Sequence, residues 1–147
     1  MKKLEFKTSI AATPKKVWDT MLHPKTYREW VNASWPGSFY EGKWAKGEKI
    51  RFLADGQGGG MLASVDEFKP YETVLIRHIA VITADGSEDR DSAEVKGLIG
   101  TLERYSFAES KGITTLTVSI ETSPEWESMF QDGWPKAVTM VKEICER

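Results

Sequence analysis

Residues 13–24 read TPKKVWDTMLHP, and this stretch predicts a helix of little more than two turns. Thr13 is a favoured N-cap, and Pro14 suits the first helical position, where a backbone N–H would have no partner. Pro24 ends the helix because the residue before a proline is driven out of the α region. The apolar residues of the stretch recur at helical spacing: Val17, Trp18, Met21 and Leu22.

The residues on either side extend this pattern. Residues 4–10 alternate between apolar and polar side chains, which indicates a half-buried strand. After Pro24, a second short helix is expected, with Tyr27, Trp30 and Val31 on one side and Pro36-Gly37 at its end. The beginning of the chain therefore reads as a strand followed by two short helices.

The middle of the chain, from residue 38 to 122, reads as consecutive strands. Alternating and β-branched runs, separated by polar or glycine-rich turns, are typical of an antiparallel sheet. Residues 56–60 are glycine-rich and predict a hairpin connection, and residues 85–92 predict a polar loop. Strands are expected from Phe39 and Tyr40 onward, and at 49–54, 61–69, 73–83, 99–108 and 113–122.

The C-terminal region predicts the helix that covers this sheet. Ser123-Pro124 repeats the cap-and-proline signal seen at residue 13, and an apolar stripe follows at helical spacing. Pro135 lies inside the stripe and removes one helical hydrogen bond, so we expect a short piece near 124–131 and a longer one at 134–146. The stripe consists of Phe130, Trp134, Val138, Val141 and Cys145.

Composition limits the classes of function. The 147 residues suit one domain spanning 1–147, and 40% hydrophobic residues are enough for a core. The net charge of −2 argues against a nucleic-acid or polybasic membrane partner. No apolar run approaches the length of a membrane span, and the N-terminus lacks a secretory pattern, so a cytoplasmic location is expected. Cys145 cannot form an internal disulfide and is interpreted as a small apolar residue.

The order of elements, together with particular motifs, resembles the START/Bet v 1-like (SRPBCC) superfamily. Within it, the chain is similar to the branch named for the activator of the heat-shock-protein-90 ATPase. The resemblance covers nearly the whole chain. The matching segments are 10–19, 24–30, 60–61, 103–107, 112–118 and 130–142.

The resemblance implies an α+β helix-grip fold, in which a seven-stranded antiparallel sheet curves around a long C-terminal helix, with two short helices after the first strand. It also implies an apolar cavity between sheet and helix. In the superfamily that cavity holds lipids, steroids, polyketides, flavonoid-like compounds or plant hormones. A few members use it for cyclase or dehydration chemistry, and the name-giving co-chaperone binds a large protein partner instead.

Two polar residues of the predicted sheet are chemical candidates. His78 shares a face with Val74 and Ile76, so it is either a core-edge histidine with a hydrogen-bond partner or a group that orients a ligand. Glu103 shares a face with Tyr105. Buried in a cavity, it would have a raised pKa and could act as acid or base, but the favoured interpretation places it at the sheet rim, paired with Arg or Lys.

Other chemistries find no support in the sequence. A nucleophile beside an oriented base is not recognisable, so no catalytic residue is assigned. His23 is expected in a solvated turn, and two histidines with one cysteine, far apart, do not make a metal site or imply a cofactor. The acidic loop at 85–91 lacks the EF-hand spacing, and the glycines at 56–60 continue into a strand, whereas phosphate loops lead into a helix.

The sequence therefore predicts a binding module for a hydrophobic small molecule. Two alternatives stay open: a co-chaperone-like interaction module with an exposed apolar patch at Trp35 and Trp44, and a polyketide cyclase- or dehydratase-like enzyme using Glu103 or His78. No membrane insertion is expected, and the chain is expected to be a monomer or weak dimer. The predicted cavity residues are Trp18, Trp30, Phe39, Phe52, Met61, Val65, Ile76, His78, Tyr105, Leu116, Trp134, Val138 and Val141.

Overall fold

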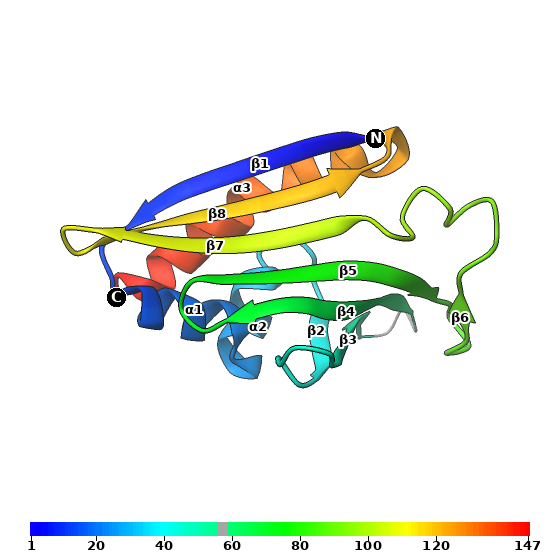
Figure 1. Ribbon diagram of the computed structural model, residues 1–147, viewed down its shortest axis with the longest axis horizontal. Coiled ribbons are helices and arrows are strands. Elements are labelled where there is room, and N and C mark those ends of the chain that lie inside the picture. Colours follow the sequence, from blue (N-terminus) through cyan, green and yellow to red (C-terminus); the bar gives the residue numbers. More distant parts are fainter. Residues whose placement is uncertain (56–58) are drawn as a thin grey trace.

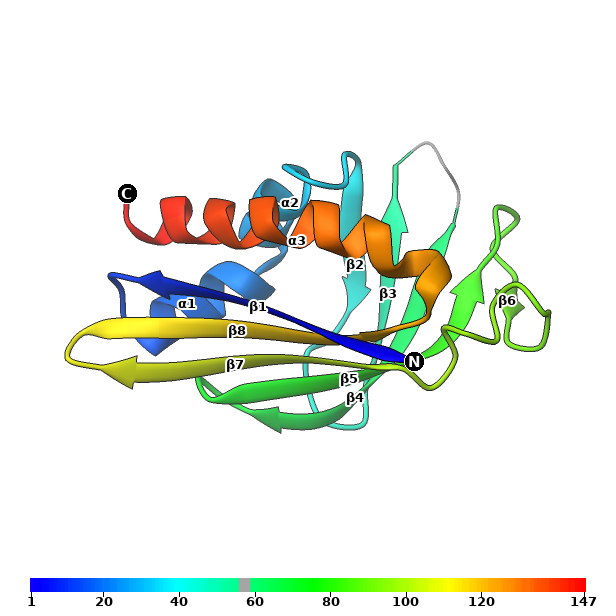
Figure 2. The ribbon, with the colours of Figure 1, turned by 90° about the horizontal axis from the view of Figure 1, so that it is seen from above.

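A curved antiparallel sheet wraps one side of a long C-terminal helix in the computed structural model, which describes residues 1–55 and 59–147 (Figures 1 and 2). Two short helices follow the first strand and lie on the same side of the sheet as the long helix. The elements are β1 (Lys2–Ile10), α1 (Pro14–Leu22), α2 (Pro24–Val31), β2 (Ser38–Gly42), β3 (Lys49–Ala54), β4 (Gly60–Lys69), β5 (Thr73–Ile82), β6 (Glu88–Asp89), β7 (Leu102–Ser110), β8 (Ile113–Thr122) and α3 (Pro124–Cys145).

The strand order confirms the predicted fold class. The main path of the sheet runs β1-β8-β7-β5-β4-β3-β2, and neighbouring strands are antiparallel. Seven strands curve around α3, so the chain has the α+β helix-grip fold. The short strand β6 pairs with the end of β5 and lies inside the polar loop predicted at residues 85–92. Of the glycine-rich connection predicted at 56–60, residues 56–58 lie outside the described residues.

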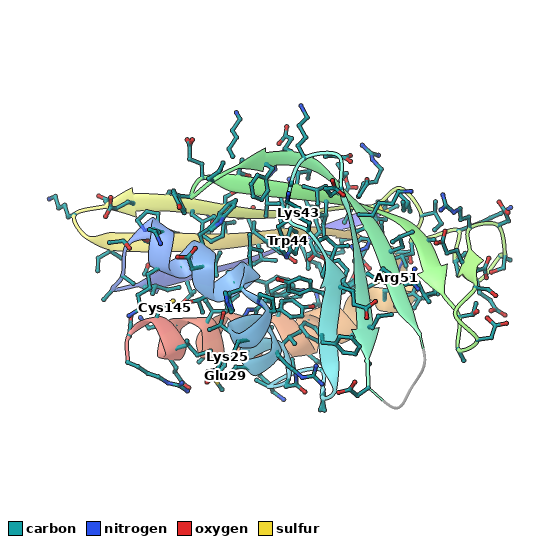
Figure 3. All side chains as sticks on the ribbon, turned by 90° about the horizontal axis from the view of Figure 1, so that it is seen from below. Lys25, Glu29, Lys43, Trp44, Arg51 and Cys145 are labelled. Atoms are coloured by element: carbon teal, nitrogen blue, oxygen red, sulfur yellow. The ribbon has the colours of Figure 1, made fainter. Side chains whose placement is uncertain are left out.

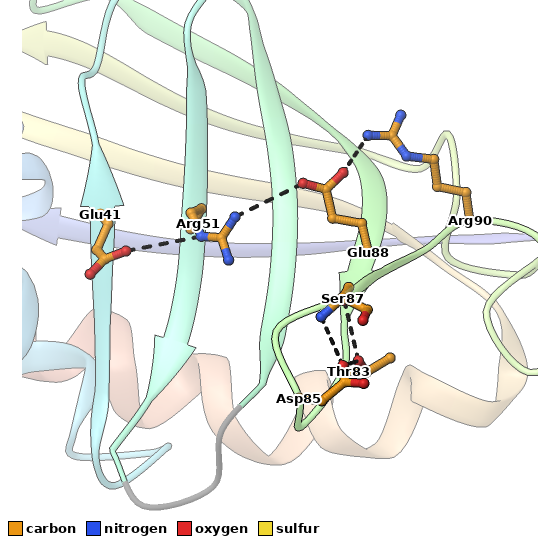
Figure 4. Close-up of polar contacts among 7 residues, drawn as sticks. All are labelled: Glu41, Arg51, Thr83, Asp85, Ser87, Glu88 and Arg90. Carbon is orange, nitrogen blue, oxygen red and sulfur yellow. Dashed lines mark hydrogen bonds and ion pairs between the residues drawn. The ribbon is translucent and has the colours of Figure 1, made fainter.

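Ion pairs on the outer surface connect β6 with its neighbours (Figure 4). The Arg51 guanidinium on β3 lies 4.0 Å from the Glu41 carboxylate on β2 and 3.9 Å from the Glu88 carboxylate on β6. Arg90 approaches the other Glu88 oxygen at 2.7 Å. These side chains are 37–60% exposed, so the pairs contribute little free energy.

The two short helices begin where the sequence predicted, and each has a side-chain cap. The Thr13 hydroxyl accepts a hydrogen bond from the Lys16 N–H at 3.2 Å. His23, expected only as a solvated turn residue, is exposed but also caps α2, because its Nδ1 accepts from the Lys25 N–H at 3.2 Å. Trp18 anchors α1 to the sheet, with its ring centre 5.2 Å from that of Phe107.

The long helix α3 is continuous from Pro124 to Cys145, so the predicted interruption at Pro135 is wrong. Pro135 and Gln131 are both exposed, so water can satisfy the carbonyl that loses its helical partner. The buried residues Trp134 and Val138 flank the proline and hold both halves of the helix against the core. Cys145 is buried at the end of this stripe, in agreement with the sequence interpretation.

A bulge divides the apolar residues of the central strands between the two faces of the sheet. Leu62 pairs with Ala80 but the next residue, Ala63, pairs with His78, so β5 carries one extra residue at Ile79. Side chains beyond a bulge change face relative to the earlier alternation. A small second cluster of Leu62, Ala80 and Ile82 therefore packs apart from the main core.

Gly133 in α3 lies against the ring of Trp35 and is expected to tolerate no side chain. A Cβ at this position would overlap Cζ2 of Trp35 and lie 2.7 Å from its Cε2. Gly133→Ala is therefore expected to lower the unfolding free energy by about 1–3 kcal/mol, although alanine is the better helix former by about 1 kcal/mol. Urea denaturation measures this change.

Trp35→Ala supplies the matched background for that experiment. With the ring removed, the same Gly133→Ala substitution should become stabilising by about 1 kcal/mol, because only helix propensity remains. Stabilisation by Gly133→Ala in the wild-type chain would contradict the close contact with Trp35.

Among residues 1–55 and 59–147, no helix is both long enough and apolar enough to cross a membrane.

Candidate functional site

A cavity of about 590 Å³ lies between the inner face of the sheet and α3. Its wall is largely aromatic and aliphatic, with a few buried polar groups at one place. Residues from α2, three central strands, β7 and the first half of α3 converge there because the sheet curves around the helix (Figure 2). The principal lining residues are Tyr27, Trp30, Phe52, Met61, His78, Val81, Glu103, Tyr105, Trp126, Met129, Phe130 and Trp134.

The polar part of the wall is a buried cluster of His78, Glu103 and Tyr105. The exposed fractions of these residues are 3% for His78, 7% for Glu103 and 3% for Tyr105. His78 Nε2 lies 3.4 Å from one carboxylate oxygen of Glu103, and the Tyr105 hydroxyl donates a hydrogen bond to the other. The neighbouring strands β5 and β7 bring these residues together, because Glu103 pairs with Ile76, two positions before His78.

The predicted position of Glu103 at the sheet rim is therefore wrong. Its carboxylate is buried, and its neighbours within bonding distance are His78 and Tyr105 instead of an arginine or lysine. The adjacent Arg104 points to the opposite face, where it pairs with Glu67 at 2.7 Å. Burial of Glu103 is tolerated because partners from two strands satisfy both of its oxygens.

Burial and the nearby Glu103 carboxylate raise the pKa of Tyr105 well above its ordinary value. Burial, followed by the charge of Glu103, likewise raises the pKa of Tyr27, another lining residue. Both phenols therefore stay neutral across the physiological range and can act as hydrogen-bond donors. Tyr105 uses this capacity on Glu103, which fixes the carboxylate in the cavity wall.

Two buried polar atoms beside this cluster have no hydrogen-bond partner within the described part of the chain. They are Nδ1 of His78 and Nε1 of Trp134. The Trp134 ring lies 6.0 Å from that of Tyr105 and 5.7 Å from that of Trp30, so it belongs to the same wall. Buried polar atoms are nearly always paired, so these two atoms are exceptions among the described residues.

The structure brings together six of the thirteen predicted cavity residues: Trp30, Phe52, Met61, His78, Tyr105 and Trp134. Five others lie in the packed core away from this cavity: Val65, Ile76, Leu116, Val138 and Val141. Phe39 is half-buried beneath the guanidinium of Arg28, whose carbon lies 5.0 Å from the ring centre. Trp18 lines a different hollow beside α1.

Sequence reasoning missed several lining residues, and some of them had a recognisable signal. Trp126, Met129 and Phe130 recur at helical spacing along one face of α3. Tyr27 shares a helix face with Trp30 and packs against it at 5.0 Å. Val81 had no such signal, because only the bulge at Ile79 directs its side chain inward.

The second hollow, of about 730 Å³, is a more open groove beside α1. Trp18, Trp44 and Phe68 supply its aromatic surface, and lysines and polar residues of α1 surround them. Trp44, labelled in Figure 3, is half-buried and packs on Tyr40 with ring centres 5.8 Å apart. Trp35 is also half-buried and lines the other cavity, so neither of the two tryptophans of the expected patch is fully exposed.

A curved antiparallel sheet that grips a long helix over an apolar cavity defines the helix-grip class of the SRPBCC superfamily. The family model for "Activator of Hsp90 ATPase homolog 1-like protein" matches residues 11–146. The chain therefore belongs to this family, as the sequence resemblance predicted.

Several solved structures share the fold at low sequence identity. The Aha1 dimer of Colwellia psychrerythraea has a TM-score of 0.73 at 16% identity, and the alignment covers 99% of this chain and 97% of that one. Protein MLL2253 of Mesorhizobium loti has a TM-score of 0.75 at 15% identity, and the alignment covers 97% of this chain and 96% of that one. CalU16 of Micromonospora echinospora has a TM-score of 0.64 at 13% identity, and the alignment covers 97% of this chain and 75% of that one. No significant match was found among curated proteins.

Proposed function

We propose that this protein binds a hydrophobic small molecule, of the lipid, polyketide or flavonoid-like kind, in the cavity between the sheet and α3. One observation carries the proposal: an aromatic-walled cavity contains a fixed buried polar cluster with two unpartnered atoms beside it. Sites for small molecules are typically apolar with a few convergent polar groups. We place this binding function in the cytoplasm, in line with the sequence-based prediction.

The size and composition of the cavity support this proposal. Its volume of about 590 Å³ falls within the usual range for ligand sites, which is roughly 300–1,000 Å³. The aromatic rings of Trp30, Trp134 and Phe52 offer flat apolar surfaces to a ligand. The cluster at Glu103 would then orient the polar end of that ligand.

Tryptophan indole resonances offer a direct test. With ¹⁵N-labelled protein, lipids, polyketides and flavonoid-like compounds are titrated while the indole N–H signals are followed by NMR. Signals of Trp30 and Trp134 should shift on binding, whereas Trp18, which does not line the cavity, serves as the internal control. Failure of every compound class to shift Trp30 and Trp134 selectively would remove the proposal.

Filling the cavity should prevent binding at little cost in stability. Val81 lines the cavity and is only half-buried, so Val81→Phe has free volume to occupy. The unfolding free energy should change by less than about 1 kcal/mol, since overpacking of a filled site costs about 1–3 kcal/mol. Affinity for any ligand found by NMR should fall more than about tenfold, which is ~1.4 kcal/mol of binding energy.

Val74→Phe is the matched control for this prediction. Val74 lies on the same strand with 0% exposure in the packed core, so the same enlargement should destabilise by about 1–3 kcal/mol or more. Equal destabilisation by both variants, measured by urea denaturation, would mean that side chains already fill the proposed site.

A second candidate is acid–base chemistry of the cyclase or dehydratase kind in the same cavity. The observation that favours it is the contiguous arrangement of Tyr105, Glu103 and His78 within an apolar wall. Buried carboxylates beside a histidine are frequent acid–base groups. Mass spectrometry of a linear poly-β-ketone incubated with the protein tests this activity, which Glu103→Gln should abolish while binding persists.

We also propose a protein partner of the chaperone type and a weak dimer. Family membership supports a chaperone-type partner, and the fold shared with a dimeric relative supports a weak dimer. Sedimentation velocity at increasing concentration distinguishes monomer from dimer.

A further inference from the structure

We propose that the cavity selects uncharged hydrophobic molecules that carry a hydroxyl group and discriminates against carboxylates such as fatty acids. This inference rests on the proposed function and specifies the chemical class of its ligand. It follows from the charges that line the cavity and from the two polar atoms that lack partners.

The charge of the cavity wall is the first argument. Glu103 is the one carboxylate among the described lining residues, and no lysine or arginine lines the cavity within residues 1–55 and 59–147. A ligand carboxylate would therefore enter an apolar space that already holds a like charge and offers no cationic side chain of Lys or Arg. Like charges repel more strongly in such a low-dielectric space than in water, so a ligand carboxylate is disfavoured there.

The hydrogen bonds within the cluster are the second argument. Both carboxylate oxygens of Glu103 already have partners, one in the Tyr105 hydroxyl and one in His78 Nε2. Because a carboxylate accepts hydrogen bonds, it favours the tautomer in which Nε2 of His78 carries the proton. The other nitrogen, Nδ1, then presents a lone pair and requires a donor from the ligand.

The indole N–H of Trp134 requires the opposite kind of partner, a hydrogen-bond acceptor. Its Nε1–H can only donate, and it has no partner within the described residues. The wall therefore offers one unpaired acceptor and one unpaired donor among the described residues. A neutral hydroxyl can donate to Nδ1 or accept from Nε1–H, whereas an ionised carboxylate can only accept and leaves Nδ1 unpaired.

Three probes with one ring system separate these contributions: pyrene, 1-hydroxypyrene and pyrene-1-carboxylate. Binding is measured at pH 7 by quenching of tryptophan emission, because Trp30 and Trp134 form part of the wall. The hydroxyl probe should bind at least about tenfold more tightly than the carboxylate, given the repulsion by Glu103. It should also bind more tightly than pyrene, because only the hydroxyl can form a hydrogen bond with either of the two free atoms.

Variants assign the selectivity to particular groups. Glu103→Gln keeps the shape and an acceptor for Tyr105 but removes the charge, so the preference for the hydroxyl over the carboxylate should shrink to less than about threefold. Glu5→Gln, which removes a carboxylate from the exposed face of β1, should leave the preference unchanged. Trp134→Phe should weaken the hydroxyl probe several-fold more than pyrene, because it removes one donor.

The outcomes distinguish the inference from the function beneath it. If none of the probes binds the wild-type chain, the proposed function fails. It also fails if Val81→Phe binds all three probes as tightly as the wild-type chain does, because the cavity is then not their site. If the probes bind in the cavity but the carboxylate is as tight as the hydroxyl, the selectivity is overturned while the binding function stands. A preference that persists undiminished in Glu103→Gln also overturns it.

Discussion

Trp30→Ala is expected to lower the unfolding free energy by about 3–5 kcal/mol, the usual cost of deleting a buried tryptophan side chain. Trp30 is 1% exposed, and its ring packs on Tyr27 at 5.0 Å and on Trp134 at 5.7 Å. Its indole N–H also donates to the Met21 carbonyl at 3.3 Å, which links α2 to α1. Urea denaturation followed by circular dichroism measures the loss, which is a large share of the ~5–15 kcal/mol typical of a domain.

Trp44→Ala provides the comparison. Trp44 is half-buried at the groove beside α1, so less apolar area is lost and the cost should be roughly half as large or less. Trp30→Phe should fall between the two, because it keeps a ring against Trp134 but leaves the Met21 carbonyl without its donor. Equal costs for Trp30→Ala and Trp44→Ala would contradict the packing described for α2.

Gly60→Ala is expected to destabilise the protein by more than about 3 kcal/mol, at the upper end of overpacking effects. A Cβ at Gly60 would overlap the carbonyl oxygen of Phe52 and lie 2.8 Å from its carbonyl carbon. Both obstructing atoms belong to the backbone of β3, so β3 and β4 could accommodate the methyl group only by separating. Because Gly60 pairs with Leu53 in this ladder, the separation would displace Phe52 and Met61 in the cavity wall.

Gly97→Ala is the control for that prediction. A Cβ at Gly97 would lie 2.9 Å from the Ser123 hydroxyl oxygen, which can rotate away, and 3.0 Å from Cβ of Ser123, which must shift slightly. The cost should therefore be about 1 kcal/mol, at the low end of overpacking effects and well below that of Gly60→Ala. Ligand titration of both variants adds a second measurement, since only Gly60→Ala should weaken binding. A stable Gly60→Ala protein with an unchanged urea midpoint would show that β3 and β4 approach less closely than described.

Local interactions explain why much of the fold could be predicted from the sequence. The cap at Thr13, the proline starts of three helices and the alternation along β1 depend on residues close together in the chain. The resemblance of the motifs to the SRPBCC superfamily then supplied the curvature and the cavity, which periodicity does not encode. Pro135 shows the limit of local reasoning, because packing on both sides of it kept α3 intact.

The candidate site was predictable only in part. Strand alternation correctly indicated that Val65, Ile76 and Leu116 lie inside with His78 and Tyr105. It could not indicate position along the sheet, and that position decides whether an inward residue reaches the cavity or the packed core. The residues of α3 divide in the same way, with Trp134 at the cavity and Val141 in the core.

By itself, the sequence determined which elements form and which face of each is apolar, because side-chain periodicity and capping act within a few residues. Only the tertiary structure decided the chemistry of the cavity. The register of β5 against β7 places His78 and Tyr105 beside Glu103, and the bulge at Ile79 turns Val81 inward. Burial of a carboxylate depends on the partners that other strands provide, and those partners are fixed only when the sheet closes around its helix.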